Sequence, residues 1–451
     1  MNVMTRTVTK PLAPATASTT AGAPDSCKAR YQALLAGEPV DSANWLAELL
    51  ERTRSMADDL PDDPQALDQW TADHAAKVAG EYAVYLQARQ QGAPRRYFAN
   101  RSQALFFLQQ VAPTKVVDGA WLHSTLSHWQ DPRYHGLIRT YLEELGDGDP
   151  RSNHVLIYQR LLSRLGCLEP VPMDDARYLQ GAVQLALGMH GDAFLPEVIG
   201  YNLGYEQPPL HLLITTYELA ELGIDGFYFQ LHVTIDNAAS GHARKSIEAL
   251  HQLCPAEDAA RFYERVRQGY RLNDLGIDTP SLIASFDLQQ ELVDALERKR
   301  VFGQFMHADH CRLQGRTINQ WLAPGEDMAS FLEALQAQRW VRRAADPLES
   351  RFFRLMEGPT APMFGVFSPY ERQLWHDWIA ADWQGPAPRR VMPGSWEAAL
   401  QIDEQGSRAR SRLSTAELTE QMAGNRHALP AGLLATRAYI RQTGLAEGRP
   451  C

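Results

Sequence analysis

Cysteine is scarce in this chain, and long apolar runs are absent. The 451 residues include five cysteines, none of them in a CxxC pair. This usage argues against a disulfide framework and against a zinc site built from thiolates, and it favours a reducing cytoplasm. No apolar run approaches the roughly 18 residues that a membrane-spanning helix needs. We therefore expect a cytoplasmic protein that does not associate with a membrane.

Basic clusters are absent as well. The formal net charge is −10 at pH 7, from 44 Lys and Arg against 54 Asp and Glu. A chain of this charge without a basic block is not expected to bind nucleic acid or an anionic membrane. The hydrophobic content of 45% and the charged content of 22% are typical of a globular protein with a large core. The expected partner is a small molecule.

The N-terminal stretch contains no apolar segment of the kind found in a secretory signal. From Met1 to about Asp25 it is rich in Thr, Ala and Pro. We expect residues 1–27 to form a disordered tail because this composition offers little to bury.

Strand patterns are also missing. The sequence has no run of alternating β-branched residues with hairpin signals, and no internal period of about 34 residues. Helical patterns, in contrast, extend from residue 28 into the C-terminal segment. Asn153 to Leu165 is clearly amphipathic, and Phe227 to Leu253 is expected to form one helix. The sequence therefore predicts an all-α protein and not a repeat array.

Several helix ends can be predicted from local signals. Asp41 suits a cap for the helix that follows it, and Pro196 suits the first turn of another. The tandem Pro208-Pro209 kinks or ends the helix before it. The Gly-Asp-Gly-Asp-Pro cluster at 146–150 is expected to stop or bulge a helix.

Two imidazoles and a carboxylate lie within eleven residues of the expected helix 227–253. His232 and Asp236 are four positions apart, so on a helix they share one face, with Cβ atoms about 5–6 Å apart. An apolar stripe that begins at Leu231 turns this face inward. A buried carboxylate beside an imidazole must be paired, hydrogen-bonded or metal-bound. From this stretch alone, a structural His–Asp hydrogen bond and a metal site both remain open.

Further groups of the same kind occur on two preceding helical segments. Helical bundles build metal sites by projecting carboxylates and imidazoles inward from facing helices. Nitrogen and oxygen ligands without thiolate suit iron or manganese, and zinc less specifically. Two ions that share a bridging carboxylate would need about six such ligands. The candidate ligands are Glu144, His154, Glu206, His232, Asp236 and His242.

These motifs resemble a known family, the haem-oxygenase-like di-iron oxidases, often described as iron-containing redox enzymes. The resemblance extends over roughly residues 96–379, and three motifs carry it. They are Glu144-Leu-Gly-Asp-Gly with His154 ten positions on, Gly204-Tyr-Glu206, and His232-x-x-x-Asp236 followed by His242. The resemblance implies a haem-oxygenase-like helical bundle that binds two Fe(II) ions in place of haem, with these six residues as ligands.

The same resemblance implies an activity and a domain organisation. The expected reaction is O2-dependent oxidation of a small amine, amino acid or related substrate, by N-oxygenation, desaturation or oxidative C–C cleavage, in natural-product biosynthesis. An external electron donor and a homodimer are further expectations. We expect an N-terminal helical segment at 28–95, the di-iron core at 96–300 and a C-terminal helical extension at 301–451.

Two features depart from the family pattern. Asp236 and His242 are six positions apart, where the family commonly has three. Three extra helical residues move a side chain about 4.5 Å along the helix axis and leave it about 60° away from the original face of the helix. A π-bulge could compensate for this change. Glu197 competes with Glu206, since the two are nine positions apart and face opposite sides of a helix; the Tyr-Glu context favours Glu206.

Other segments have no assigned role in this interpretation. The segment from Lys115 to Trp121, which includes Asp118, also looks like family sequence, but no chemical role follows for it. His307 and His310 are interpreted as part of a solvated helix end. Two other classes of function remain as alternatives: a metal-independent hydrolase on the same fold with a cysteine nucleophile, and a non-catalytic helical interaction protein.

Overall fold

The computed structural model describes residues 26–169, 171–235, 241–383, 385 and 412–445. Apart from one short hairpin, the elements in these ranges are helical, and the predicted all-α class is confirmed. The hairpin pairs β1 (Arg312–Leu313) with β2 (Arg316–Thr317) in antiparallel register. The described part of the chain has no helix that is both long enough and apolar enough to cross a bilayer.

The α-helices of the described residues follow one another in chain order. They are α1 (Cys27–Ala36), α2 (Ser42–Thr53), α3 (Leu67–Gln90), α4 (Arg101–Gln110), α5 (Ala112–Lys115), α6 (His135–Glu144), α7 (His154–Leu165), α8 (Leu179–His190), α9 (Leu195–Tyr205), α10 (Leu210–Glu221), α11 (Phe227–Ile235), α12 (His242–Leu253), α13 (Ala259–Arg271), α14 (Thr279–Ala284), α15 (Leu288–Gly303), α16 (Ile318–Trp321), α17 (Met328–Ala337), α18 (Arg351–Arg354), α19 (Pro369–Ala380), α21 (Thr415–Met422) and α22 (Pro430–Thr443). Three 3₁₀ segments matter for the site: η2 (Ala120–His128), η4 (Gly146–Gly148) and η9 (Arg426–Ala428).

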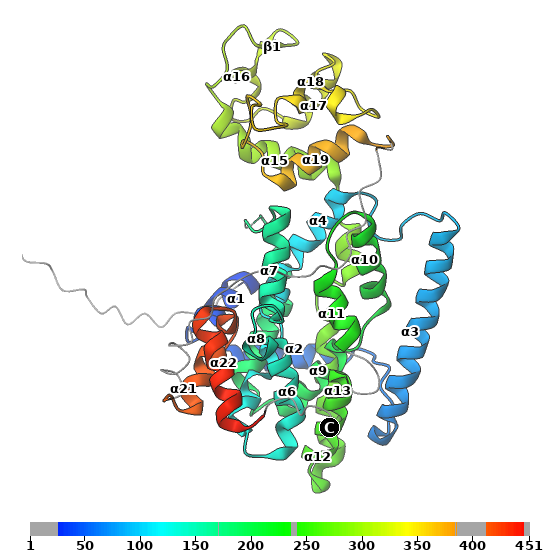
Figure 1. Ribbon diagram of the computed structural model, residues 1–451, viewed down its shortest axis with the longest axis vertical. Helices are drawn as coiled ribbons and strands as arrows, with labels where there is room; N and C mark the ends of the chain where they lie inside the picture. The colour runs from blue at the N-terminus through cyan, green and yellow to red at the C-terminus, as the bar shows by residue number, and fades with distance from the viewer. Residues whose placement is uncertain (1–25, 170, 236–240, 384, 386–411, 446–451) are drawn as a thin grey trace, which may run out of the picture.

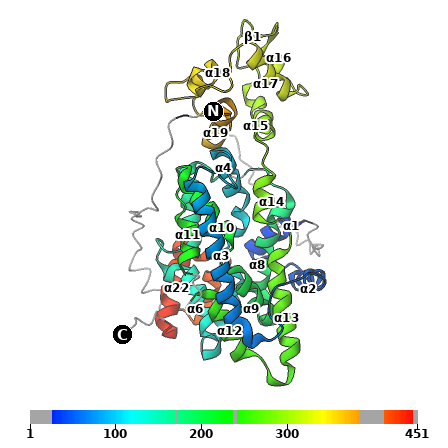
Figure 2. The same ribbon diagram turned by 90° about the vertical axis from the view of Figure 1, so that its right-hand side faces the viewer.

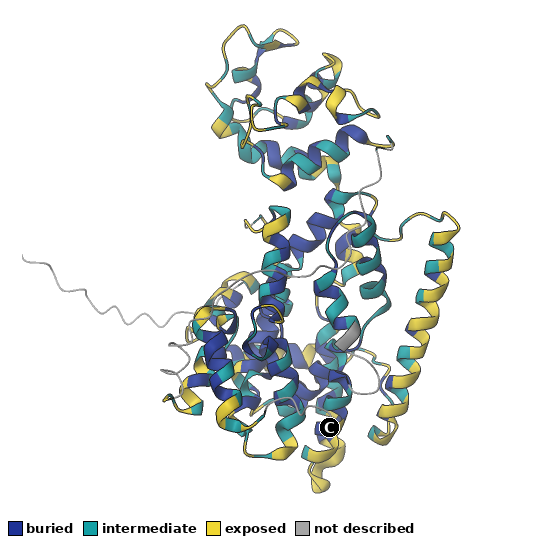
Figure 3. Ribbon diagram, viewed as in Figure 1, coloured by how far each residue is buried: buried dark blue, intermediate teal, exposed yellow. Residues whose placement is uncertain are grey.

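The helices form a large bundle with a smaller lobe at one end. Helices α15–α19 make up the lobe, and the bundle contains the helices before them together with α21 and α22 (Figures 1 and 2). One apolar core fills the bundle around Trp121, Tyr141 and Ile199. A second core joins the bundle helices α4, α7 and α11 to the lobe through side chains such as Phe229 and Trp375. Buried residues accordingly gather in the bundle interior, whereas α3 exposes most of its length (Figure 3).

Local signals in the sequence account for several helix ends. Asp41 caps α2 through its side chain, which accepts a hydrogen bond from the backbone of Asn44, and Pro196 lies in the first turn of α9. The tandem Pro208-Pro209 lies between the end of α9 and the start of α10. These three predictions are confirmed, because each residue restricts the backbone in the way that its position requires.

The N-terminal helices pack onto the bundle through buried carboxylates. Glu218 on α10 is fully buried and accepts hydrogen bonds from the Tyr85 hydroxyl of α3 and from the backbone N–H groups of residues 96–98. Asp58 binds Arg267 and Arg271 of α13. The segment before residue 96 is therefore anchored to the bundle by ion pairs and hydrogen bonds in addition to apolar contacts.

The chain reverses sharply between α6 and α7, at the Gly-Asp-Gly cluster. Gly146, Asp147 and Gly148 have φ values of +60°, +51° and +79°. A Cβ atom at Gly146 would lie 2.4 Å from the backbone nitrogen of Asn153, so glycine is required there. Asn153 then caps α7 by accepting from the backbone of Leu156. The predicted interruption of helical structure is confirmed.

One predicted element is wrong. The stretch from Phe227 to Leu253 was expected to be a single helix, but α11 ends at Ile235 and α12 begins at His242. Gly241 precedes α12 with an extended backbone, ψ 179°, which interrupts the helix. His242 is thus placed by a new helix start and not by a π-bulge in a continuous helix. Asp236 lies outside the described residues.

The C-terminal helices return to the bundle and cover the reversal. Met422 at the end of α21 accepts a hydrogen bond of 2.6 Å from the Tyr141 hydroxyl of α6. Arg437 of α22 donates to the carbonyl of Gly148, and His427 of η9 contacts Asn153 at 2.9 Å. Helices α21 and α22 therefore hold the turn that joins α6 to α7 from the outside (Figure 1).

Candidate metal centre

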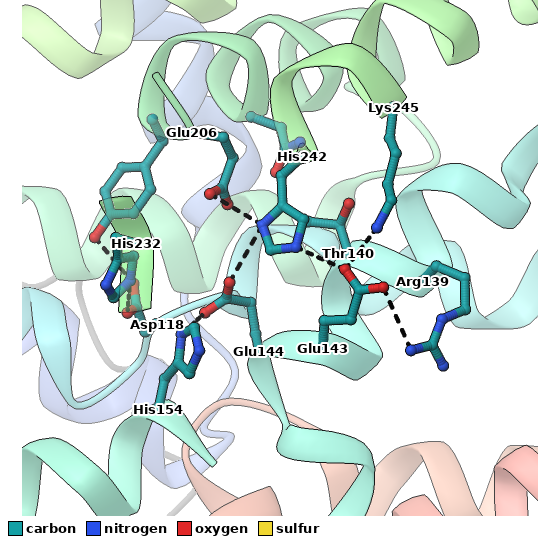
Figure 4. A network of polar contacts seen from close by, with 12 residues as sticks. Asp118, Arg139, Thr140, Glu143, Glu144, His154, Glu206, His232, His242 and Lys245 are labelled. Carbon is teal, nitrogen blue, oxygen red and sulfur yellow. Dashed lines mark hydrogen bonds and ion pairs between the residues drawn. The ribbon is translucent and has the colours of Figure 1, made fainter. Parts of the chain in front are cut away.

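Two overlapping groups of potential metal ligands lie inside the bundle. In each group, one donor atom from every member lies within 4.8 Å of the others. The first group contains Asp118, Glu144, His154 and His232, and the second contains Glu144, Glu206 and His242. Glu144 belongs to both, and its side chain lies between the two sets in Figure 4. None of the six residues is more than 7% exposed.

Most of these side chains come from helix ends. Glu144 is the last residue of α6 and His154 the first of α7, so the reversal at η4 brings the two together. Glu206 is the C-cap of α9, and His242 is the first residue of α12. The reversal between α6 and α7 therefore brings the first two donors together, and the packing of α9 and α12 brings Glu206 beside His242.

Asp118 is a member of the first group that sequence reasoning missed. Its Oδ2 atom lies 3.2 Å from Nε2 of His232, and the Tyr205 and Tyr228 hydroxyls donate to its carboxylate. A Cβ atom at Gly119 would lie only 2.9 Å from Cβ of Glu144, so this glycine allows the segment to approach. The family-like sequence around Asp118 was a signal, but its distance along the chain from the other ligands gave it no spacing pattern.

Several buried polar atoms in the centre have no hydrogen-bond partner among the described residues. They include both carboxylate oxygens of Glu144, Oε1 of Glu206 and Nδ1 of His154. Nδ1 of His154 nevertheless lies 2.5 Å from Oε2 of Glu144. The ion pair between Glu144 and His154 offsets part of the cost of burying these atoms, but leaving the others, such as Oε1 of Glu206, unsatisfied in a protein interior costs several kcal/mol. A cation would satisfy them together, so the donor set fits a metal ion.

Two histidines are oriented by the ring nitrogen that faces away from the other candidate ligands. Nδ1 of His232 lies 2.9 Å from the carbonyl oxygen of Tyr228 and donates to it, which leaves Nε2 facing Asp118. Nε2 of His242 lies 2.7 Å from Glu143, while its Nδ1 lies 3.2 Å from Oε2 of Glu206. Each ring therefore turns its other nitrogen toward the candidate ligand carboxylates, which is the orientation that a metal ligand needs.

The charges of the first group stabilise one another. Burial alone would raise the pKa of Glu144, but the adjacent His154 lowers it. Burial alone would lower the pKa of His154, but the charge of Glu144 raises it. The pKa of Asp118 is also lowered despite burial, by the charge of Lys115 and the contact with His232. The carboxylates thus remain ionised and give the centre the negative charge that attracts a cation.

The structure separates the predicted ligands from their competitors. Glu197 points to α13, where Arg265 binds both of its carboxylate oxygens at 2.6 and 2.7 Å, and it belongs to neither group. Glu206 lies beside His242. Within the described ranges, His307 and His310 belong to no group of potential ligands, and neither group contains a cysteine.

A pocket of about 450 Å³ leads to the centre. Two of the candidate ligands, His154 and His242, form part of its wall. Phe227 and Leu231 supply apolar surface, and the other side chains, apart from Gly146, are polar or charged. The other lining residues are Glu143, Gly146, Asp147, Arg151, Ser152 and Lys245. A small molecule in this pocket would therefore contact the imidazoles of both groups.

The fold and this cluster define a helical protein with a buried centre of carboxylates and imidazoles. The model of the family described as iron-containing redox enzyme matches residues 105–274, a range that includes every member of both groups. This segment matches the family that the motifs predicted, and its fold is the all-α haem-oxygenase-like fold. The match supports an oxidoreductase role. Searches of curated proteins and of solved structures found no significant match.

Proposed function

We propose that this protein is a non-haem di-iron, O2-dependent oxidase or oxygenase. One Fe(II) ion would bind in each group, with Glu144 shared between the two. The observation that carries the proposal is this overlap, since a carboxylate common to two adjacent sets of ligands is what a pair of ions requires. The set of oxygen and nitrogen donors without sulfur suits iron.

The ligand residues account for the binding of both ions. His154 and His232 would supply nitrogen ligands on one side, and His242 on the other, with Asp118 and Glu206 as the outer carboxylates. Two ferrous ions, when bound, supply electrons for the reduction of O2. The bundle keeps the ligands buried, which limits the access of water to the reacting groups.

The pocket supports a small substrate with charges of both signs. Its wall carries the carboxylates of Glu143 and Asp147 and the cations of Arg151 and Lys245, next to the apolar Phe227 and Leu231. A small amine or amino acid would find partners for its charged groups and for its side chain. N-oxygenation, desaturation and oxidative C–C cleavage are the proposed reactions, in natural-product biosynthesis in the cytoplasm, with an external reductant.

Anaerobic titration with Fe(II) tests this proposal. Metal-free protein is expected to bind two Fe(II) ions per chain and, on rapid mixing with O2, to show a transient visible absorption. Protein loaded with redox-inert Zn(II) is the control and is expected to show none. Faster decay of the transient with particular amino acids would identify the substrate. Binding of fewer than two ions per chain, or no reaction with O2, would contradict the proposal.

A further inference from the structure

Glu143 precedes the shared carboxylate Glu144 in the chain but contacts the centre in a different way. Its Oε2 atom lies 2.7 Å from Nε2 of His242 and 2.5 Å from Nζ of Lys245 (Figure 4). Its Oε1 atom lies 3.4 Å from Nη2 of Arg139. Glu143 belongs to neither group of potential ligands. Its carboxylate therefore reaches a candidate ligand from the side that faces away from the other ligands.

This contact fixes which nitrogen of His242 faces the second group. An ionised carboxylate only accepts hydrogen bonds, so the imidazole Nε2 must donate to Glu143. Nδ1 is then the ring nitrogen that a metal ion in the second group would bind. That atom lies 3.2 Å from Oε2 of Glu206 and 3.5 Å from Oε1 of Glu144. The hydrogen bond to Glu143 thus turns Nδ1 toward the second group.

The two groups differ in how their imidazoles are held. In the first group, His232 donates to a carbonyl of its own helix, four residues back. In the second group, the acceptor for His242 is a side chain on α6, a different helix. The second group also has one imidazole where the first has two. Loss of the orientation of His242 would therefore affect one of the three potential ligands of the second group.

We propose that Glu143 is a positioning residue that orients His242 for metal binding in the second group. Lys245, one turn along α12 from His242, and Arg139, one turn before Glu143 on α6, hold the carboxylate in place. The inference rests on the proposed function, because it assumes that a metal ion binds there. Carboxylate partners of ligand histidines typically change metal affinity by about 10- to 100-fold.

The test compares Glu143→Ala and Glu143→Gln with the unmodified full-length protein. Glu248→Ala is the matched control, since Glu248 lies on α12 but is exposed and pairs with Arg244 at 3.2 Å. Co(II) is titrated anaerobically into metal-free protein, and binding is followed by calorimetry and by visible absorption. Crystals soaked with Mn(II) show, by anomalous scattering, which of the two positions is occupied.

Glu143→Ala is expected to weaken one of the two Co(II) binding events by about 10- to 100-fold and the other by less than about threefold. Glu143→Gln retains an uncharged acceptor and is expected to weaken the same event by about three- to tenfold. Glu248→Ala is expected to match the unmodified protein. In the Mn(II) crystals of Glu143→Ala, the position beside Glu206 and His242 loses occupancy.

Three results separate the possible failures. If the unmodified protein does not bind two Co(II) ions, the proposed function fails first. If it binds two and Glu143→Ala binds both with unchanged affinity, or loses the ion beside His154 and His232, the positioning role is wrong. If Glu143→Ala does not fold, as judged by circular dichroism, the isosteric Glu143→Gln decides the matter, and unchanged affinity in that variant overturns the inference.

Discussion

Replacement of Glu144 by Gln is the most direct test of the shared ligand, and Glu197 supplies a matched control. Both carboxylates are buried, with 1% and 3% exposure. Glu144 is common to the two groups of potential ligands, whereas Glu197 is bound through both oxygens by Arg265. Glu144→Gln keeps the size and shape of the side chain and removes one negative charge. We expect it to impair the binding of both ions, and Glu197→Gln to impair neither.

The size of the effect follows from the geometry. At an effective dielectric constant of about 20, a unit charge 4 Å from a divalent ion contributes about 8 kcal/mol. Only part of this energy is lost in Glu144→Gln, because the amide keeps a carbonyl oxygen as a neutral ligand and because the charge of Glu144 is already paired with His154 in the metal-free protein. We expect a net loss of about 3 kcal/mol in the binding free energy of each ion, which corresponds to about a 100-fold loss of affinity. The loss applies twice because Glu144 lies within 4.8 Å of the donor atoms of both groups.

Calorimetric titration of the metal-free variants with Co(II) measures both affinities. Glu197→Gln is expected to bind two ions with unchanged affinity, although loss of its charged hydrogen bonds to Arg265 should reduce the free energy of unfolding by about 1–3 kcal/mol. Weakening of only one ion in Glu144→Gln would show that Glu144 is not shared. Equal weakening in both variants would mean that a general loss of stability, and not the removal of a ligand, explains the result.

Three other predictions concern single residues. Asp118→Asn should lose one of two bound Fe(II) ions, measured as metal per chain after dialysis; retention of both would exclude Asp118 as a ligand. Burial lowers the pKa of His427 to about 3. Below pH 6.5 the unfolded state of the metal-free protein therefore binds a proton that the folded state does not, and the free energy of unfolding decreases as the pH is lowered. Urea unfolding measures the effect: between pH 6.5 and pH 5, His427→Gln should lose about 2 kcal/mol less stability than the unmodified protein. An unchanged pH dependence would contradict this. Gly146→Ala should lower the free energy of unfolding by about 1–3 kcal/mol or more, because φ at this position is +60° and a Cβ atom would collide with the backbone of Asn153. Gly80→Ala is the control: a Cβ atom there has no neighbour within 4 Å, so the change should stabilise the protein by about 0.5–1 kcal/mol.

The elements that the sequence predicted well are those set by local interactions. The helix stop after Glu144, the first-turn proline of α9 and the Asp41 cap each depend on the backbone within a few residues. The expected helix across 227–253 was wrong because the apolar periodicity on both sides continues in phase, and a single glycine at 241 gives only a weak signal for a new helix start.

The candidate site was predictable only in part. Five of the six candidate ligands named from the motifs lie together in the bundle, and the sixth, Asp236, lies outside the described residues. Asp118 was missed, and Glu143 was not considered. Neither has a spacing relation to the other residues that a linear pattern could reveal, because their partners lie on other helices.

The sequence by itself determined the all-α class, several helix ends and the types of donor available, because periodicity, capping and composition act over a few residues. Only the tertiary structure decided which carboxylates lie beside which imidazoles. Helix packing sets that choice. It places Glu144 between two groups of potential ligands, directs Glu197 on α9 to Arg265 on α13, and brings Asp118 to His232 across 114 positions of the chain.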